Sequence, residues 1–164
     1  MPSKRHLPSQ TGFTIIELIM VIVLIGILSV GARSLFFSRD SYAGFLARDQ
    51  LVSAALLAQQ QALGMSAINN PVTLVVANTG TDWTFTVSKS GALTTYTSTQ
   101  ESGASTLAID GTTLASGASQ SFTWNGQGSM SDNNGHAFLF TGEYSWRTCL
   151  SASGYAWASD GACP

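Results

Sequence analysis

An apolar segment near the N-terminus constrains this chain more than any other feature. The twenty residues from Phe13 to Ala32 contain one charged side chain, Glu17. A helix of that length is ~30 Å long, which matches the hydrocarbon thickness of a bilayer. An unpaired charge in that environment costs roughly 2.5–3.5 kcal/mol at the helix centre and less near an end. The sequence therefore predicts a membrane span in which Glu17 has a partner.

The residues before this segment predict its orientation. Lys4 and Arg5 lie on the N-terminal side, and positive charge holds that end in the cytoplasm. An ordinary secretory signal, with a cut after residues 29–32 and a mature start near residue 33, is the competing interpretation. Glu17 inside the apolar core and the unbroken helical pattern that follows argue against it.

The two cysteines, Cys149 and Cys163, lie close together near the C-terminus. In a chain with an N-terminal export signal, such a pair predicts a disulfide formed in an oxidising compartment. Two free reduced thiols are the alternative. The spacing fits neither a CxxC redox motif nor a zinc site.

From Arg33 onward the apolar residues become periodic, at spacings built from three, four and seven residues. This pattern predicts an amphipathic continuation of the helix, which ends near Gly64 and covers a sheet. Gly44 is expected to weaken the helix by ~1 kcal/mol relative to alanine. The residues predicted to form the apolar face are Leu35, Tyr42, Phe45, Leu46, Val52, Leu56 and Leu63.

After Pro71 the pattern changes to short alternating segments separated by turns, which implies an antiparallel sheet or sandwich. The Ser/Thr-rich residues 98–121 are expected to form a long exposed loop or hairpin that contains the weak strand Thr106–Ile109. Aromatic residues at alternating positions predict a core face, whereas exposure of one or two would favour adhesion. The predicted strands are Val72–Val76, Trp83–Ser88, Leu93–Thr97, Thr106–Ile109, Ser121–Asn125, Ala137–Thr141, Tyr144–Leu150 and Tyr155–Ala158.

Catalytic and ligand-binding motifs are not found. His136, beside a turn, is interpreted as a surface histidine, and Asp132 with Asn133 and Asn134 predicts a plain turn, because it falls short of a calcium loop. Nucleophile elbows, HExxH motifs and phosphate-binding loops do not occur. Only 10% of the residues are charged, and no basic footprint for nucleic acid is present. We expect no enzymatic activity, no cofactor, no metal and no nucleic-acid partner.

The run Gly12-Phe13-Thr14-Ile15-Ile16-Glu17, followed by the apolar stretch, resembles the class III signal of type IV pilins and type II secretion pseudopilins. The resemblance implies that a prepilin peptidase cuts between Gly12 and Phe13 and that Phe13 is N-methylated. It also implies that Glu17 acts in assembly. Phe13 lies four residues before Glu17, which would place both on one helix face.

The resemblance implies an α+β pilin-like fold, with a long N-terminal helix packed on an antiparallel β-sheet or β-sandwich domain. The expected parts are a leader peptide (1–12), a transmembrane and assembly half of the helix (13–33), an amphipathic half (34–66), and a periplasmic β-domain with a C-terminal disulfide loop (67–164). The proline that major pilins often carry near residue 33 is absent, so whether the helix bends within residues 33–41 stays open.

The implied location is the inner membrane, crossed once with the N-terminus in the cytoplasm and the C-terminal domain in the periplasm. After assembly, the subunit would lie in a pilus at the cell surface or a pseudopilus in the periplasm. The implied partners are the prepilin peptidase/methyltransferase, other pilins or pseudopilins, and the inner-membrane assembly platform.

The C-terminal residues 146–154 resemble the minor pilins and pseudopilins of the GspH/FimT type, and Phe45–Leu63 looks most like the MshC-type minor pilins of mannose-sensitive haemagglutinin (MSHA) pili. The implied function is a structural minor subunit in or at the tip of an MSHA-like type IV pilus for adhesion or motility. A minor pseudopilin of a type II secretion system and a non-polymerising, membrane-anchored surface-binding domain are the alternatives. Relatives that bind DNA carry G-R-x-R where residues 154–157 read Gly-Tyr-Ala-Trp, so DNA uptake is not expected.

Overall fold

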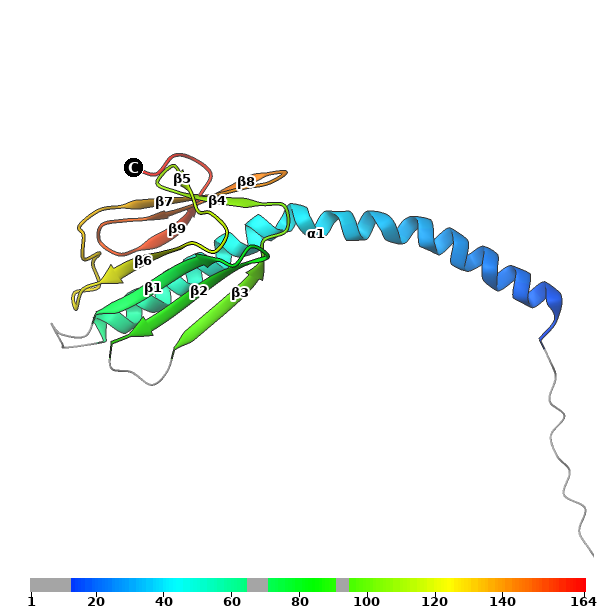
Figure 1. The fold of residues 1–164 in the computed structure, drawn as a ribbon, viewed down its shortest axis with the longest axis horizontal. Coiled ribbons are helices and arrows are strands. Elements are labelled where there is room, and N and C mark those ends of the chain that lie inside the picture. Colours follow the sequence, from blue (N-terminus) through cyan, green and yellow to red (C-terminus); the bar gives the residue numbers. More distant parts are fainter. Residues whose placement is uncertain (1–12, 65–70, 91–94) are drawn as a thin grey trace, which may run out of the picture. The chain divides into compact units, whose positions relative to one another are not determined.

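The computed structural model describes residues 13–64, 71–90 and 95–164, and of residues 30–41 the backbone alone. The chain divides into two compact units, Met1–Phe37 and Ser38–Pro164. Helix α1 (Ile15–Leu63), which is labelled in Figure 1, contributes residues to both units. The helix begins at Ile15 rather than at the predicted Phe13, and its backbone stays helical through residues 33–41.

Two antiparallel sheets follow α1 in the second unit, so the α+β architecture expected from the sequence is confirmed. The first sheet has the strand order β3-β2-β1-β6, and the second has the order β5-β4-β7-β8-β9. The strands are β1 (Val72–Asn78), β2 (Asp82–Lys89), β3 (Tyr96–Glu101), β4 (Thr106–Ile109), β5 (Thr112–Thr113), β6 (Ser119–Trp124), β7 (His136–Thr141), β8 (Ser145–Leu150) and β9 (Ala156–Ser159).

The prediction for residues 98–121 is confirmed in part, since the weak strand Thr106–Ile109 is β4 and forms a hairpin with β5. The expected exposure is wrong, and residues 98–101 belong to β3, which lies later than the predicted strand Leu93–Thr97. Leu107 and Ile109 of β4 are buried in the core. β3 escaped recognition because it is a sheet edge with a largely solvated surface, so its sequence lacks apolar alternation. Residues 91–94, which include the predicted start of this strand, lie outside the described part of the chain.

The core-facing stripe of α1 in the second unit consists mainly of alanine, which corrects the prediction that large residues form it. Tyr42, Leu46 and Leu63 are exposed instead. The small alanine side chains let the helix backbone approach the sheets closely, whereas large side chains would hold it away. The buried residues of this stripe are Ala43, Ala47, Leu51, Ala54, Ala55, Ala58 and Ala62.

Gly44 lies where α1 meets the second sheet. A Cβ atom placed on Gly44 would lie 3.0 Å from Cδ1 of Trp146 and 3.5 Å from Cβ of Phe140. The Trp146 ring also packs edge-on against Phe45, with centroids 5.3 Å apart. The residue that weakens the helix on propensity therefore allows the Trp146 indole to contact the helix backbone.

The alanine stripe shares one apolar core with both sheets. Most of the aromatic residues predicted to form a core face lie in it, namely Trp83, Phe85, Phe122, Trp124, Phe138 and Phe140. Tyr144 and Tyr155 are exposed. The second unit thus has a core built from its own residues.

Candidate functional site

The first turn of α1 is capped by a side chain next to the predicted cleavage site. The backbone N–H of Glu17 donates to Oγ1 of Thr14 at 3.3 Å, and the N–H of Leu18 donates to the carbonyl of Thr14 at 3.2 Å. Thr14 is therefore the N-cap, and Glu17 occupies the third helical position, as in a capping box. A carboxylate in the first turn also interacts favourably with the helix dipole. Sequence reasoning missed this role of Thr14, although T-x-x-E before an apolar run is its signature.

The described side chains of residues 13–29 present apolar groups around the whole circumference of α1. Their exposed fractions run from 85% for Phe13 to 47% for Val21. Ser29 donates its hydroxyl to the carbonyl of Ile25 at 2.7 Å, so the helix itself satisfies this polar group. A helix that is apolar on every side is stable where lipid or other apolar helices cover it. This surface, with Glu17 at its start, is the candidate assembly segment.

Phe13 precedes the helix, since α1 begins at Ile15. The expectation that Phe13 and Glu17 share one helix face is therefore wrong for this structure. The cleavage residue Gly12 lies outside the described residues. So do the side chains of residues 30–33, the end of the predicted transmembrane half.

In the part of the chain that the structure describes, no helix combines the length and the apolar character needed to cross a membrane.

The two cysteines form the predicted disulfide. Cys149 on β8 is bonded to Cys163, with an S–S distance of 2.03 Å and a Cα–Cα distance of 5.5 Å. Nη1 of Arg147 donates to the carbonyl of Gly161 at 2.6 Å. The covalent bond and this hydrogen bond fasten the C-terminal residues to the second sheet.

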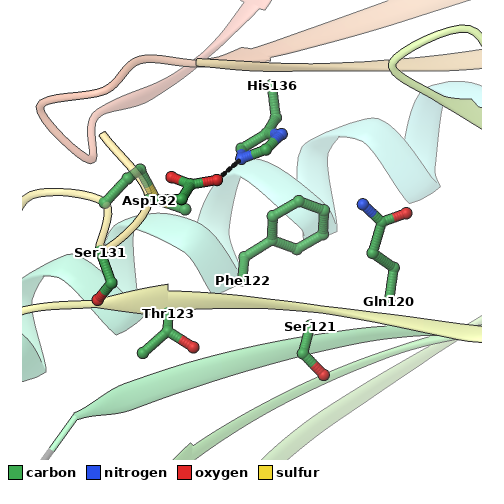
Figure 2. Close-up of a pocket in the computed structure, with 8 residues that line it drawn as sticks. Gln120, Ser121, Phe122, Thr123, Ser131, Asp132 and His136 are labelled. Atoms are coloured by element: carbon green, nitrogen blue, oxygen red, sulfur yellow. Dashed lines mark hydrogen bonds and ion pairs between the residues drawn. The ribbon is translucent and has the colours of Figure 1, made fainter. Parts of the chain in front are cut away.

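His136 is held between two carboxylates rather than lying free in a surface loop. Its Nδ1 lies 2.7 Å from Oδ2 of Asp110 and its Nε2 lies 2.9 Å from Oδ2 of Asp132 (Figure 2 draws the Asp132 contact). Its ring packs edge-on against Phe122 at 4.9 Å. Because carboxylates only accept hydrogen bonds, the ring donates to both when it carries two protons. Sequence reasoning missed Asp110, which follows β4 and is distant from His136 in the chain.

Asp132 forms the predicted turn as well as the contact with His136. Its Oδ1 accepts a hydrogen bond from the backbone N–H of Asn134 at 3.1 Å. Burial raises the pKa of the Asp132 carboxyl, but the hydrogen bonds from Asn134 and His136 and the positive charge of His136 leave that pKa below its ordinary value of 3.8. The carboxyl is thus stabilised in its charged form.

A pocket of about 360 Å³ lies beside this cluster, with Phe122 between the polar side chains (Figure 2). Both ring nitrogens of His136 are engaged by carboxylates, so neither is free to act as a base. Among the described residues, no group of three His, Cys, Asp or Glu side chains is arranged to hold a metal ion. The cluster joins the turn after β4, the β6–β7 connection and the start of β7, which is a structural role.

Gly154 is required for packing. Its φ is +85°, and a Cβ atom on it would lie 2.0 Å from the carbonyl oxygen of Gly128. Nε1 of Trp124 donates to the carbonyl of Gly154 at 3.0 Å. The following Tyr155 and Trp157 stack with their planes 15° apart. Residues 155 and 157 therefore present an aromatic pair instead of the two arginines of the G-R-x-R pattern.

Comparison with known proteins supports the interpretation of the N-terminus. Residues 7–32 match the prokaryotic N-terminal methylation motif. No curated protein gives a significant match. Among solved structures, the chain is similar to the type IV minor pilin FimU of Pseudomonas aeruginosa (strain PAO1), with 12% identity, 69% of this chain and 90% of that chain covered, and a TM-score of 0.49.

The methylation motif contains the predicted cleavage residues Gly12 and Phe13 and the predicted assembly residue Glu17. The motif does not separate one pilus system from another, so the MshC-type resemblance stays a prediction.

Proposed function

We propose that this chain is a structural minor pilin that assembles through α1 into, or at the tip of, an MSHA-like type IV pilus. The observation that carries the proposal is the methylation motif over residues 7–32, continued by the exposed apolar surface of α1. In this proposal the chain is cut between Gly12 and Phe13, N-methylated at Phe13, and held in the inner membrane with its β-domain in the periplasm until assembly.

Glu17 sets the position of an incoming subunit in this proposal. Cleavage creates a positively charged amine on Phe13, and Thr14 holds Glu17 in the first turn, close to that new chain end. In apolar surroundings an unpaired amine or carboxylate is costly. Pairing the Glu17 carboxylate of one chain with the Phe13 amine of its neighbour removes both costs and fixes the stagger between subunits.

The capped helix start allows charge and capping to be tested separately. Glu17→Gln removes the charge but keeps a side chain suited to a capping box, whereas Thr14→Ala removes the cap and keeps the charge. We expect Glu17→Gln to be cleaved normally and to enter filaments at least about tenfold less than the unchanged chain, a difference of about 1.4 kcal/mol. Thr14→Ala should still assemble. Normal incorporation of Glu17→Gln would contradict the pairing.

Processing has its own measurement. Mass spectrometry of the mature protein should find an N-methylated Phe13 at the N-terminus. A start near residue 33 would mean an ordinary secretory signal, and the pilin proposal would then fail.

A minor pseudopilin of a type II secretion system shares each of these steps, and the genes beside this one would separate the two systems. The surface-binding alternative is favoured by one observation, the exposed Tyr155 stacked on Trp157. Normal filaments in a deletion strain, together with lost surface binding that a Tyr155→Ala chain fails to restore, would support it over assembly.

A further inference from the structure

We propose that the open edge of β3 is an interface at which two copies of this chain pair, joining their first sheets into one antiparallel sheet. β3 ends the first sheet and has β2 on one side only (Figure 1). An unpaired strand edge presents a row of N–H and C=O groups that another strand can bond. The inference goes beyond the proposed function and does not depend on it.

The other sheet edges are short or partly covered. β5 has two residues. β9 is followed by the residues that the Cys149–Cys163 disulfide fastens to β8. On β6, the carbonyl of Thr123 accepts a hydrogen bond from the N–H of Ser131 at 2.8 Å. Among the described residues, β3 alone offers six consecutive strand residues with no segment bonded to the outer side.

The sequence of β3, YTSTQE, lacks the usual protection of an edge strand. It contains no proline, glycine or lysine, which are residues that interrupt or repel an added strand. Threonine and tyrosine favour extended backbone. This edge is therefore suited to pairing.

The direction of the free backbone groups follows from one hydrogen bond. The N–H of Ser102 donates to the carbonyl of Thr81 at 2.9 Å, toward β2. Backbone groups alternate sides along a strand, so those of Thr97, Thr99 and Glu101 point away from β2. These three residues would make the hydrogen bonds to an added strand.

A groove opens on the α1 side of this edge. A groove of about 410 Å³ lies between α1 and β3, lined by Leu46, Asp49, Gln50, Ser53, Tyr96, Ser98 and Thr99. Gln50 bonds the side chains of both Ser98 and Gln100. The edge is thus held in position beforehand, which lowers the entropy that pairing must overcome.

A second copy fits this edge in a register centred on Thr99. Thr99 then lies opposite Thr99 of the other copy, and Thr97 lies opposite Glu101. Every outward-facing backbone group meets a partner, and no two like charges are opposite one another. The side chains that face α1 stay on one side of the joined sheet, so the grooves of the two copies lie next to each other.

Disulfide trapping tests this register in the full-length chain. The native cysteines are bonded to each other, and the described residues contain no free thiol. In Thr99→Cys the two Cα atoms would be ~5.5 Å apart, within the range for a disulfide. Mild oxidation should give at least about tenfold more covalent dimer than Thr113→Cys, the matched exposed position on the β5 edge.

Proline substitutions on β3 and β6 test whether the outward N–H groups of β3 are needed for the dimer. Added to Thr99→Cys, Thr97→Pro removes an outward N–H and should abolish the dimer, while the unfolding midpoint shows that the domain still folds. Ser121→Pro, at an outward position of the β6 edge, should leave the dimer unchanged. The proposal is overturned if Thr113→Cys dimerises equally, if Thr97→Pro leaves the dimer intact, or if the cysteine introduced on β3 is trapped on a different protein.

Discussion

The two stretches of α1 whose side chains are described differ in how their apolar surfaces are covered. Residues 15–29 are apolar on every side and exposed, whereas residues 42–63 bury a narrow stripe of alanine against two sheets. Both are helical, so backbone conformation does not distinguish them. The difference lies in which groups cover the apolar surface of each stretch.

In the second stretch, groups of the same chain cover the buried surface of the helix. Its alanine stripe, Gly44 and the tie from Gln50 to β3 match particular groups of the two sheets. In the first stretch the large apolar side chains are exposed, and a Cβ atom on Gly26 would meet nothing within 4 Å. The first stretch is therefore suited to partners outside the chain, where a uniform apolar surface tolerates several neighbours.

The largest difference is expected from one substitution made in both stretches. Leu51→Ala removes a fully buried side chain and should lower the free energy of unfolding by about 2–5 kcal/mol. Leu24→Ala, at a side chain that is 57% exposed, should leave that value unchanged. All four tryptophans lie in the second unit, so urea unfolding in mild detergent can be followed by their fluorescence. Equal losses would mean that residues 15–29 share the domain core.

Gly44 and Gly26 form a second matched pair. Alanine gains about 1 kcal/mol of helix propensity at either position. At Gly44 the added Cβ also meets Trp146, and such overpacking costs about 1–3 kcal/mol. Gly44→Ala should therefore lower the unfolding free energy of the second unit by about 1 kcal/mol. Gly26→Ala should not change that value, because Gly26 lies in the first unit. A stabilised Gly44→Ala would show that the indole moves away easily.

Substitution of Thr14 tests whether the first turn of α1 is stabilised independently of the β-domain. Thr14→Ala removes the cap and should cost about 1 kcal/mol locally, whereas Thr14→Ser keeps the hydroxyl and should cost less. Amide hydrogen exchange at Glu17 and Leu18 should become about fivefold faster in the alanine variant. The tryptophan unfolding curve should not move. A shifted curve would mean that the first turn is coupled to the β-domain.

The sequence predicted best where a strand has one buried and one solvated face. In β1 and β2 the apolar residues alternate, and both strands were recognised from that pattern. The pattern failed for β3, where the exposed edge permits polar residues throughout. It failed again on α1, because alanine is compatible with both buried and exposed positions, and close backbone approach selects it at the buried ones.

Some polar sites were likewise predicted from the sequence, and one was missed. Cys149 and Cys163 were identified because they are the only cysteines, and Glu17 because it is the only charge in an apolar run. Asp110 was missed because nothing in the sequence links it to His136, 26 residues later. A residue that differs from its sequence neighbours can be recognised from the sequence. Two side chains that the order of the strands brings together cannot.

The smallest expected effect is a pH dependence confined to the second unit. The pKa of Asp132 is lower in the folded chain than its ordinary value of 3.8, so the unfolded chain binds this proton more tightly. Its contribution to stability is therefore complete above about pH 4 and is lost as the pH falls through the folded pKa. Because the side chain is 45% exposed, solvent screening should keep that contribution below about 1 kcal/mol.

Asp132→Asn should accordingly flatten the fall in the unfolding free energy of the domain between about pH 5 and pH 3 by a small amount. Asp160→Asn, on the exposed C-terminal residues beyond β9, is the matched control and should leave the slope as it is. Tryptophan fluorescence in urea at each pH measures both variants. Exchange at Glu17 and Leu18 should follow the same pH profile with and without Asp132, since the described residues place this carboxylate among β-domain groups only. A steeper slope in Asp132→Asn would mean that the folded chain, and not the unfolded one, binds this proton more tightly.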